Sequence, residues 1–385
     1  MGLPEGALTT AVRHALGQEP AAWHRAPGRV NLIGDHTDYA LGYCLPMAID
    51  RECLLGVTPA AGDRIRGQSL ELGGVAVVPV DGGVDPRTIE PRWAGFVAGA
   101  LQAVAAHGAL VPALDLAVSS TVPAGSGLSS SSALAVALTM AFADAGDVSL
   151  SRDELAIAAL DAEVRATGVP GGLMDQLAAV HGVADHALLI DCRDLAIEPI
   201  PMPDELAVLV AHCGVARTLA DSEYADRRNA TDKAAARLGL GSLRDATMRQ
   251  VDHDPRARHV VSENARVEEF AEAMRTGNLA ELGPLLLASH ASLRADFEVS
   301  TPELDALVAS FVDAGALGAR LTGAGFGGCV VALAWRERIE SALARVAEEY
   351  RNRTGHTTTP FEVRAAGGAT SSRGAGPSSA RTPPP

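Results

Sequence analysis

A glycine- and serine-rich loop between a strand-like run and an apolar helix constrains this chain most. The loop reads Pro123-Ala-Gly-Ser-Gly-Leu-Ser-Ser-Ser-Ser-Ala133, and it follows Leu114–Ser119 and opens onto a helix predicted over Ser132–Ala145. Its glycines let the backbone approach a ligand closely, and the unpaired amides of a helix start attract anions. A flexible linker or an ordinary capped helix start are the plainer interpretations, but a linker would not join a strand to a strong helix. We predict a phosphate loop at residues 123–133.

This loop lacks the lysine of a Walker A motif, and the only lysine of the chain, Lys233, has no glycine-rich surroundings. Phosphate chemistry must therefore rely on arginine, backbone amides or a metal ion. A second run, Gly323-Ala-Gly-Phe-Gly-Gly328, has the letters of a dinucleotide motif but precedes a strand-like segment instead of a helix. We predict a tight glycine turn here, packed beside another backbone and able to border the active site.

Strand-like and helical segments alternate along the chain, which predicts a mixed α/β architecture. Further strands are expected at 187–191 and 207–211 and near 318 and 329, and helices at 93–106, 223–238, 263–274, 279–293 and 301–314. Alternating prolines at 199, 201 and 203 predict a connector, so one domain spans 1–200 and a second spans 201–365. Residues 366–385, rich in Gly, Ser and Pro, are expected to be a disordered tail without a packed role.

The composition narrows the possible partners. A net charge of -15 repels nucleic acid and anionic membranes, and neither an apolar membrane span nor a signal-peptide pattern is present. We expect a cytoplasmic, monomeric protein that acts on small molecules. The cysteines, at 44, 53, 192, 213 and 329, form no C-x-x-C pair, so we predict buried free thiols rather than disulfides or a zinc site.

Three polar residues, Asp35, His36 and Asp38, follow an apolar run that we expect to be a strand over Arg29 to Ile33. As metal ligands they are too few, because no partner with ligand spacing is nearby. As sugar ligands they fit, because carboxylates and imidazole match adjacent hydroxyl groups. A solvated loop is the plain alternative.

Two acidic residues, Glu163 and Asp175, bracket the turn Thr167-Gly-Val-Pro-Gly-Gly-Leu-Met174. An aspartate at a helix start is often only a cap. Together with a nucleotide loop, however, one carboxylate for Mg²⁺ and one for the acceptor hydroxyl is what a kinase requires.

These segments together resemble the galactokinases. Gly28-Arg-Val-Asn-Leu-Ile-Gly-Asp-His-Thr-Asp-Tyr39 is similar to their signature, and residues 123–133 and 321–328 resemble two further motifs of the wider GHMP kinase superfamily. Gly172-Leu-Met-Asp-Gln176, Ser222-Glu-Tyr-Ala-Asp-Arg-Arg228, Ser289-His-Ala-Ser-Leu-Arg294 and Val299 to Asp305 add to the similarity, which covers almost everything except the tail.

The resemblance implies a two-domain fold, with an N-terminal α/β domain like domain 2 of ribosomal protein S5 and a ferredoxin-like α+β C-terminal domain. It also implies site roles: catalysis by Asp175 and Arg29; sugar binding by Asp35, His36, Asp38, Gly172 and Tyr224; ATP binding by Trp93, Gly125, Ser126, Gly127, Leu128, Ser129 and Ser130; and Mg²⁺ binding by Ser131 and Glu163.

The implied reaction transfers the γ-phosphoryl group of ATP to the C1 hydroxyl of α-D-galactose. A guanidinium beside a carboxylate favours the charged form, which argues for positioning by Asp175 over early proton abstraction. Alternatives are a related sugar-1-kinase acting on another sugar and a non-catalytic, galactokinase-like sugar sensor. The intact Ser129 to Ala133 run and the presence of Arg29, Glu163 and Asp175 argue against the sensor.

Three positions depart from the galactokinase pattern. Asp35 stands where these kinases carry a glutamate that contacts the C6 hydroxyl, Ala40 replaces an asparagine, and Gly171 replaces a common cysteine. The shorter Asp35 therefore leaves the identity of the sugar open.

Overall fold

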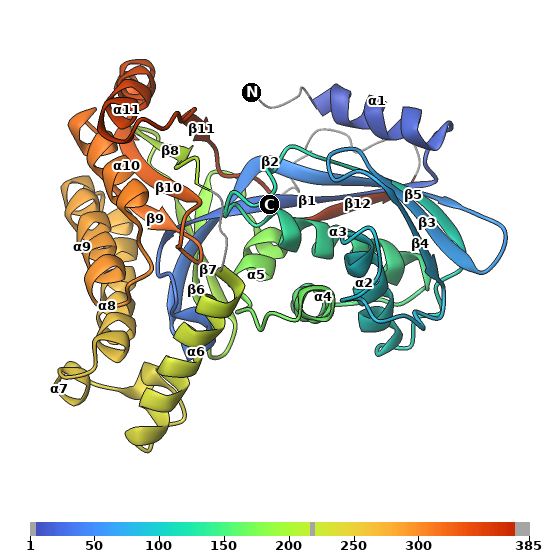
Figure 1. Ribbon diagram of the computed structural model, residues 1–385, viewed down its shortest axis with the longest axis horizontal. Coiled ribbons are helices and arrows are strands. Elements are labelled where there is room, and N and C mark those ends of the chain that lie inside the picture. Colours follow the sequence, from blue (N-terminus) through green and yellow to red (C-terminus); the bar gives the residue numbers. More distant parts are fainter. Residues whose placement is uncertain (1–4, 216–219, 374–385) are drawn as a thin grey trace.

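The computed structural model describes residues 5–215 and 220–373, which form two sheets, each covered by helices (Figure 1). The first sheet has eight strands, in the order β12-β1-β2-β5-β3-β4, with β6 paired to β2 and β7 paired to β6. The second has four, in the order β11-β8-β10-β9. The mixed α/β prediction is confirmed.

The first sheet contains β1 (Ala22–Ile33), β2 (Tyr43–Pro59), β3 (Arg64–Ser69), β4 (Val75–Pro79), β5 (Leu114–Ser120), β6 (His186–Asp191), β7 (Ala196–Pro201) and β12 (Thr370–Arg373). Helices α2 (Ala94–Ala105), α3 (Ser130–Ala145), α4 (Arg152–Thr167) and α5 (Met174–His181) cover one face, and α1 (Glu5–Leu16) lies on the other (Figure 1). Only β3 and β5 pair in parallel in this sheet, within the described ranges.

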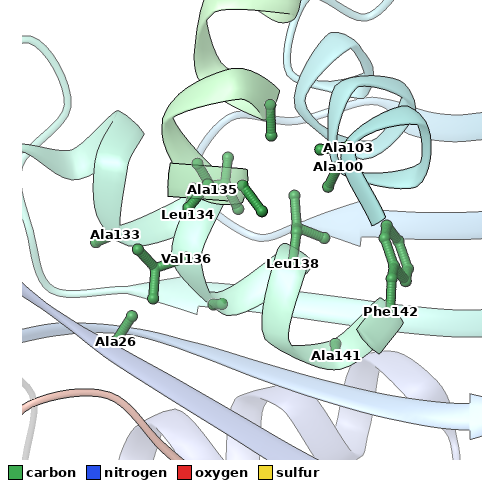
Figure 2. Packing of buried hydrophobic residues seen from close by; sticks show 14 of the residues in the cluster. Ala26, Ala100, Ala103, Ala133, Leu134, Ala135, Val136, Leu138, Ala141 and Phe142 are labelled. Atoms are coloured by element: carbon green, nitrogen blue, oxygen red, sulfur yellow. The ribbon is translucent and has the colours of Figure 1, made fainter. Parts of the chain in front are cut away.

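Helix α3 lies at the centre of the first domain because it is apolar on nearly every side, as expected for a buried helix. Figure 2 shows Leu138 and Phe142 of α3 near Ala100 and Ala103 of α2, with Val136 toward Ala26 of β1. The small alanines let α2, α3 and α4 approach closely. This packing fixes the start of α3, and with it the phosphate loop.

The second sheet consists of β8 (Leu206–His212), β9 (Gly318–Thr322), β10 (Cys329–Trp335) and β11 (Phe361–Val363). Its helices are α6 (Ala220–Arg237), α7 (Met248–Val251), α8 (Pro255–Thr276), α9 (Leu282–Ala295), α10 (Pro302–Asp313) and α11 (Ile339–Thr354); short 3-10 turns lie at 38–40, 243–245, 279–281 and 336–338. Alternate residues of β8 face opposite cores, as strand geometry requires. Leu209 packs toward Phe311 of α10, whereas Val208 and Val210 join a core that includes Val30 of β1.

The two domains share one hydrophobic core, because Val30 of β1 packs in the same cluster as Val208 of β8 and Val331 of β10. Strand β1 also contributes Ala26 to the core of the first domain.

The chain passes from the first sheet to the second between Pro201 and Leu206. Of the prolines expected to form a connector, Pro203 lies in this segment, whereas Pro199 and Pro201 lie in β7 and pair with β6. All five cysteines are buried free thiols, as predicted.

The expectation for the tail was wrong at its start. Residues 370–373 form β12, which pairs antiparallel with β1 in the register Ala22↔Arg373 to Arg25↔Thr370. A glycine- and serine-rich composition gave no sign of this pairing, because the edge of β1 supplies the backbone partners. The rest of the predicted tail, 374–385, lies outside the described residues.

Candidate active site

A cavity of about 1020 Å³ lies between the two domains. Its wall is formed by β1, the loop at residues 34–38 (the polar loop), the phosphate loop, α4 and the start of α5, together with α6 and the glycine turn at residues 323–328 from the second domain. Segments that are distant in the sequence thus meet around one space, as in most small-molecule sites.

Arg29 and Asp175 form a bidentate ion pair on the cavity wall. Arg29 Nε donates to Asp175 Oδ1 and Nη2 to Oδ2, both at 2.7 Å, while Nη1 donates to the carbonyl of Gly127 at 2.7 Å. Arg29 comes from β1, and Asp175 lies in the first turn of α5. One guanidinium therefore connects the phosphate loop to the carboxylate.

The phosphate loop is laid directly against β1. The amide of Arg29 donates to the carbonyl of Leu128 at 3.1 Å, and a Cβ at Gly28 would lie only 2.7 Å from that oxygen. Ser126 folds the loop on itself by donating to the Pro123 carbonyl at 2.7 Å. Close backbone approach therefore requires glycine at position 28.

Ser129 ends the phosphate loop in the left-handed conformation, with φ 61°, just before α3. Its hydroxyl makes no cap to the helix and instead donates to Asp175 Oδ2 at 2.5 Å. The first amides of α3 thus remain available for an anion, since residues 130–132 line the cavity.

Glu163 of α4 lies behind the phosphate loop. Its Oε2 accepts hydrogen bonds from Ser132 Oγ at 2.9 Å and Gln176 Nε2 at 2.6 Å. Burial raises the pKa of Glu163, and hydrogen bonding from Ser131 opposes that rise. A bound cation would favour the charged carboxylate here.

Asp38, Gly172 and Tyr224 lie together on the cavity wall. A Cβ at Gly172 would lie 1.6 Å from Asp38 Oδ2, so only glycine leaves room for the carboxylate. Burial, followed by the neighbouring charge of Asp175, raises the pKa of Asp38 to about 6. Burial also raises the pKa of the Tyr224 hydroxyl well above its usual value.

His36 is a neutral, fully engaged imidazole. Nε2 lies 3.2 Å from the carbonyl of Ala324, which can only accept, so Nε2 donates and Nδ1 accepts from the Tyr39 hydroxyl at 2.9 Å. Burial lowers the pKa of His36 to about 3, and its ring lies 4.6 Å from that of Phe297. His36 therefore ties the polar loop to the glycine turn.

Asp35 is more deeply enclosed than Asp38. Its carboxylate pairs with the buried guanidinium of Arg320 on β9 and accepts from the Gly323 amide at 3.2 Å. Burial raises its pKa, against the opposing charge of Arg320.

Most of the predicted site residues line this one cavity: Arg29, Asp35, His36, Asp38, Gly125, Gly127, Ser129, Ser130, Ser131, Glu163, Gly172, Asp175 and Tyr224. The other three, Trp93, Ser126 and Leu128, do not. Ser126 and Leu128 shape the loop from within.

Trp93 is 4 % exposed, donates from Nε1 to the Gly73 carbonyl at 2.9 Å and packs beside Gly67. Its ring is therefore part of the core, and this geometry gives no support to the expectation that it lies near the adenine.

Several residues that hold the site in place were not predicted from the sequence. Gln176 and Ser132 hold Glu163, and Arg228 of α6 donates to the carbonyls of Pro170 and Gly171 at 3.2 and 3.0 Å. Gln176 and Arg228 stand in segments that resemble the galactokinases, which was a usable signal, whereas nothing in the sequence distinguished Arg320 from other arginines. The glycine turn does border the cavity, through Gly323 and Ala324, and Phe326 donates its amide to the Val299 carbonyl at 2.7 Å, which confirms the predicted backbone packing.

Family models match three parts of the chain. Residues 13–59 match the galactokinase galactose-binding signature, residues 95–183 match the GHMP kinases N terminal domain, and residues 270–352 match the GHMP kinases C terminal domain. Within the described residues, no helix has both the length and the hydropathy needed to cross a membrane.

Similarity to individual galactokinases extends over nearly the whole chain. A galactokinase of Roseiflexus sp. (strain RS-1) is 40% identical over 381 residues, covering 95% of this chain and 97% of that protein. One from Chloroflexus aurantiacus is 40% identical over 376 residues, 94% and 96% of the two chains.

Solved structures agree with this similarity. The crystal structure of Lactococcus lactis galactokinase complexed with galactose matches with a TM-score of 0.88 at 30% identity, covering 95% of this chain and 99% of that one. Methanococcus jannaschii mevalonate kinase shares the fold, with a TM-score of 0.66 at 19% identity.

Proposed function

The chain belongs to the galactokinase family of the GHMP kinases, and from that membership we propose how it transfers the γ-phosphoryl group of ATP to the C1 hydroxyl of α-D-galactose. The single observation that carries the mechanism is the bidentate Arg29–Asp175 pair, positioned between the phosphate loop and the polar loop.

In this mechanism the phosphate loop binds the nucleotide. The free amides at the start of α3 and the glycines at 125 and 127 face the phosphates, with Ser129 and Ser130 beside them. Arg29 neutralises charge that develops on the transferring group, which is the main catalytic requirement of a loose phosphoryl-transfer transition state.

The acceptor hydroxyl meets Asp175. Its carboxylate is fixed by Arg29 and Ser129, so it is an oriented acceptor for the hydroxyl proton. The proton is transferred as the bond from the C1 oxygen to the γ-phosphorus forms and the bond from that phosphorus to the β,γ-bridging oxygen breaks, with ADP as the leaving group. His36, Asp38, Gly172 and Tyr224 surround the remaining hydroxyl groups of the sugar.

The residues that fit Mg²⁺ lie on the wall of the same cavity. Glu163 and Ser131 offer the oxygen ligands that this ion prefers, and one carboxylate with substrate phosphates is a common way to bind it. Glu163 accepts hydrogen bonds from the neutral side chains Ser132 and Gln176, and no ion pair to it occurs among the described residues. When bound, the ion would neutralise phosphate charge.

An ADP-release assay across a sugar panel tests this function. We expect galactose to be among the best substrates, with talose, glucose, galacturonic acid, galactosamine and arabinose as the comparison set. Turnover of another sugar without galactose would identify a related sugar-1-kinase. Binding of ATP and galactose with no ADP release would identify a sugar sensor instead.

A further inference from the structure

Asp35 differs from the other acidic residues of the cavity in how little of it can be reached. Its side chain is 3 % exposed, whereas that of Asp175 is 25 % exposed. Asp35 lines the cavity, but each of its carboxylate oxygens already has a partner within the protein, so it offers a sugar hydroxyl no free acceptor comparable to that of a more exposed carboxylate.

The charge of Asp35 is already matched within the protein. The guanidinium of Arg320 is completely buried and donates from Nη2 to Asp35 Oδ2. Through Nη1 the same group donates to the carbonyls of Leu32 and Asn31, at 3.1 and 3.4 Å. Arg320, on a strand of the second domain, therefore forms hydrogen bonds both to the end of β1 and to the polar loop.

The other oxygen of Asp35 holds the glycine turn, because Oδ1 accepts the Gly323 amide at 3.2 Å. The backbone on either side is fixed from α8, where His259 donates to the Asp35 carbonyl at 3.1 Å and Glu263 accepts the Gly34 amide at 3.0 Å. Every one of these contacts crosses from the first domain to the second.

We propose that Asp35 is a positioning residue, whose ion pair with Arg320 fixes the polar loop against the glycine turn, and that it does not bind the sugar itself. This inference rests on the proposed function for the identity of the site. His36 is the side chain that it positions most directly, since His36 Nε2 donates to Ala324 in the same turn. Specificity for the sugar hydroxyls then comes from Asp38 and Tyr224.

The proposal is tested by combining a change in the protein with changes in the substrate and comparing the losses in kcat/KM. Wild type and Asp35→Asn are assayed with galactose and with its 2-, 3-, 4- and 6-deoxy derivatives. A positioning residue affects every sugar alike, so we expect Asp35→Asn to lower kcat/KM about 10-fold or more, by the same factor within about twofold for all five. Asp38→Asn is the positive control. The loss in kcat/KM caused by this substitution should vanish for the deoxy sugar that lacks the hydroxyl bound by Asp38.

If the loss in Asp35→Asn also vanished for one deoxy sugar, Asp35 would be a ligand of that hydroxyl and the proposal would be overturned. Because Asp35→Asn leaves the Arg320 charge buried and unpaired, it could fail to fold. The double variant Asp35→Asn/Arg320→Gln removes both charges and is assayed with the same five sugars. A uniform loss supports the proposal, and a loss that vanishes for one deoxy sugar overturns it.

The pair itself is tested by thermal unfolding of both single variants and the double variant. We expect the double variant to lose less than the sum of the two single losses in Tm, and simple additivity would overturn the pairing. This measurement needs no turnover. If the wild type failed to phosphorylate galactose, the proposed function would fall while the coupling between residues 35 and 320 could still be measured.

Discussion

Arg29 and Asp175 face one another through two parallel hydrogen bonds of 2.7 Å, with the third arm of the guanidinium on the Gly127 carbonyl. The pair therefore fixes the distance between the phosphate loop and the acceptor carboxylate. Removing the carboxylate leaves the proposed sugar ligands Asp38 and Tyr224 in place. We expect Asp175→Ala to lower kcat by at least about 1,000-fold, while the Kd for galactose changes little.

ADP release and calorimetric galactose binding measure these two quantities separately. Asp161→Ala is a suitable control, because Asp161 is an exposed aspartate of α4 paired only with Arg165 among the described contacts. Unchanged turnover in Asp175→Ala would remove Asp175 from the mechanism.

The fork of Arg29 is the basis of a second prediction. A lysine carries the same charge but cannot make two parallel bonds to Asp175 and a third to Gly127. We expect Arg29→Lys to lower kcat about 100-fold, with a smaller effect on the KM for galactose. Steady-state kinetics with ATP and galactose varied in turn would check it. A kcat close to wild type would mean that charge alone suffices.

Gly172 and Gly171 provide a matched pair of substitutions. A Cβ at Gly172 would lie 1.6 Å from Asp38 Oδ2, whereas one at Gly171 meets only Leu160 Cδ1, at 3.4 Å. Gly172→Ala should therefore displace Asp38 and raise the KM for galactose by about 10-fold or more, equivalent to about 1.4 kcal/mol. Gly171→Ala should leave the KM within about twofold. Equal KM values in the two variants would contradict the role of Asp38.

The sequence was sufficient to predict features that depend on local pattern. The alternation of apolar residues located β5, β8, α2, α3 and α10 to within a few residues of their bounds. The phosphate loop was recognisable because its glycines and its position before a helix are local properties. The polar loop was recognisable for the same reason, and its three polar residues do line the cavity.

What the sequence could not show depends on contacts between distant segments. Asp35 and Arg320 are 285 positions apart, and no local feature pairs them. Trp93 was expected near the adenine only from the family resemblance, and the hairpin at residues 64–79 that buries it decides its environment. β12 forms because β1 has an open edge, which only the folded sheet creates.

Glu163 leads to a prediction about the proposed Mg²⁺ site. Its neutral hydrogen-bond partners hold the carboxylate in place, so Glu163→Gln preserves much of the packing and removes the charge. We expect the Mg²⁺ concentration for half-maximal activity to rise about 10-fold or more. Ser132→Ala is the control, since Ser132 contacts Glu163 but is not a proposed ligand, and its Mg²⁺ dependence should shift less. An unaltered Mg²⁺ dependence in Glu163→Gln would separate Glu163 from the ion.

Asp38 makes stability depend on pH in an unusual direction. Burial and the charge of Asp175 raise its pKa from 3.8 to about 6, so the folded protein binds this proton more tightly than the unfolded chain does. The contribution of Asp38 to stability is therefore present below about pH 4 and is lost as the pH rises through about 6. A shift of this size corresponds to on the order of 3 kcal/mol.

Asp38→Asn removes this titration. The charge of Asp38 also raises the pKa values of Tyr39 and Tyr224, but both stay protonated over the pH range of the test. We expect the free energy of unfolding of Asp38→Asn, relative to wild type, to be greater at pH 8 than at pH 4 by up to about 3 kcal/mol. Urea unfolding at both pH values measures the difference, and the depressed pKa values of His36 and Glu263 cancel because both proteins carry them. A difference that did not change with pH would mean that Asp38 titrates normally. The same variant should bind galactose more weakly at pH 8, because the charge that costs stability there is the one that we propose as an acceptor for the sugar hydroxyls.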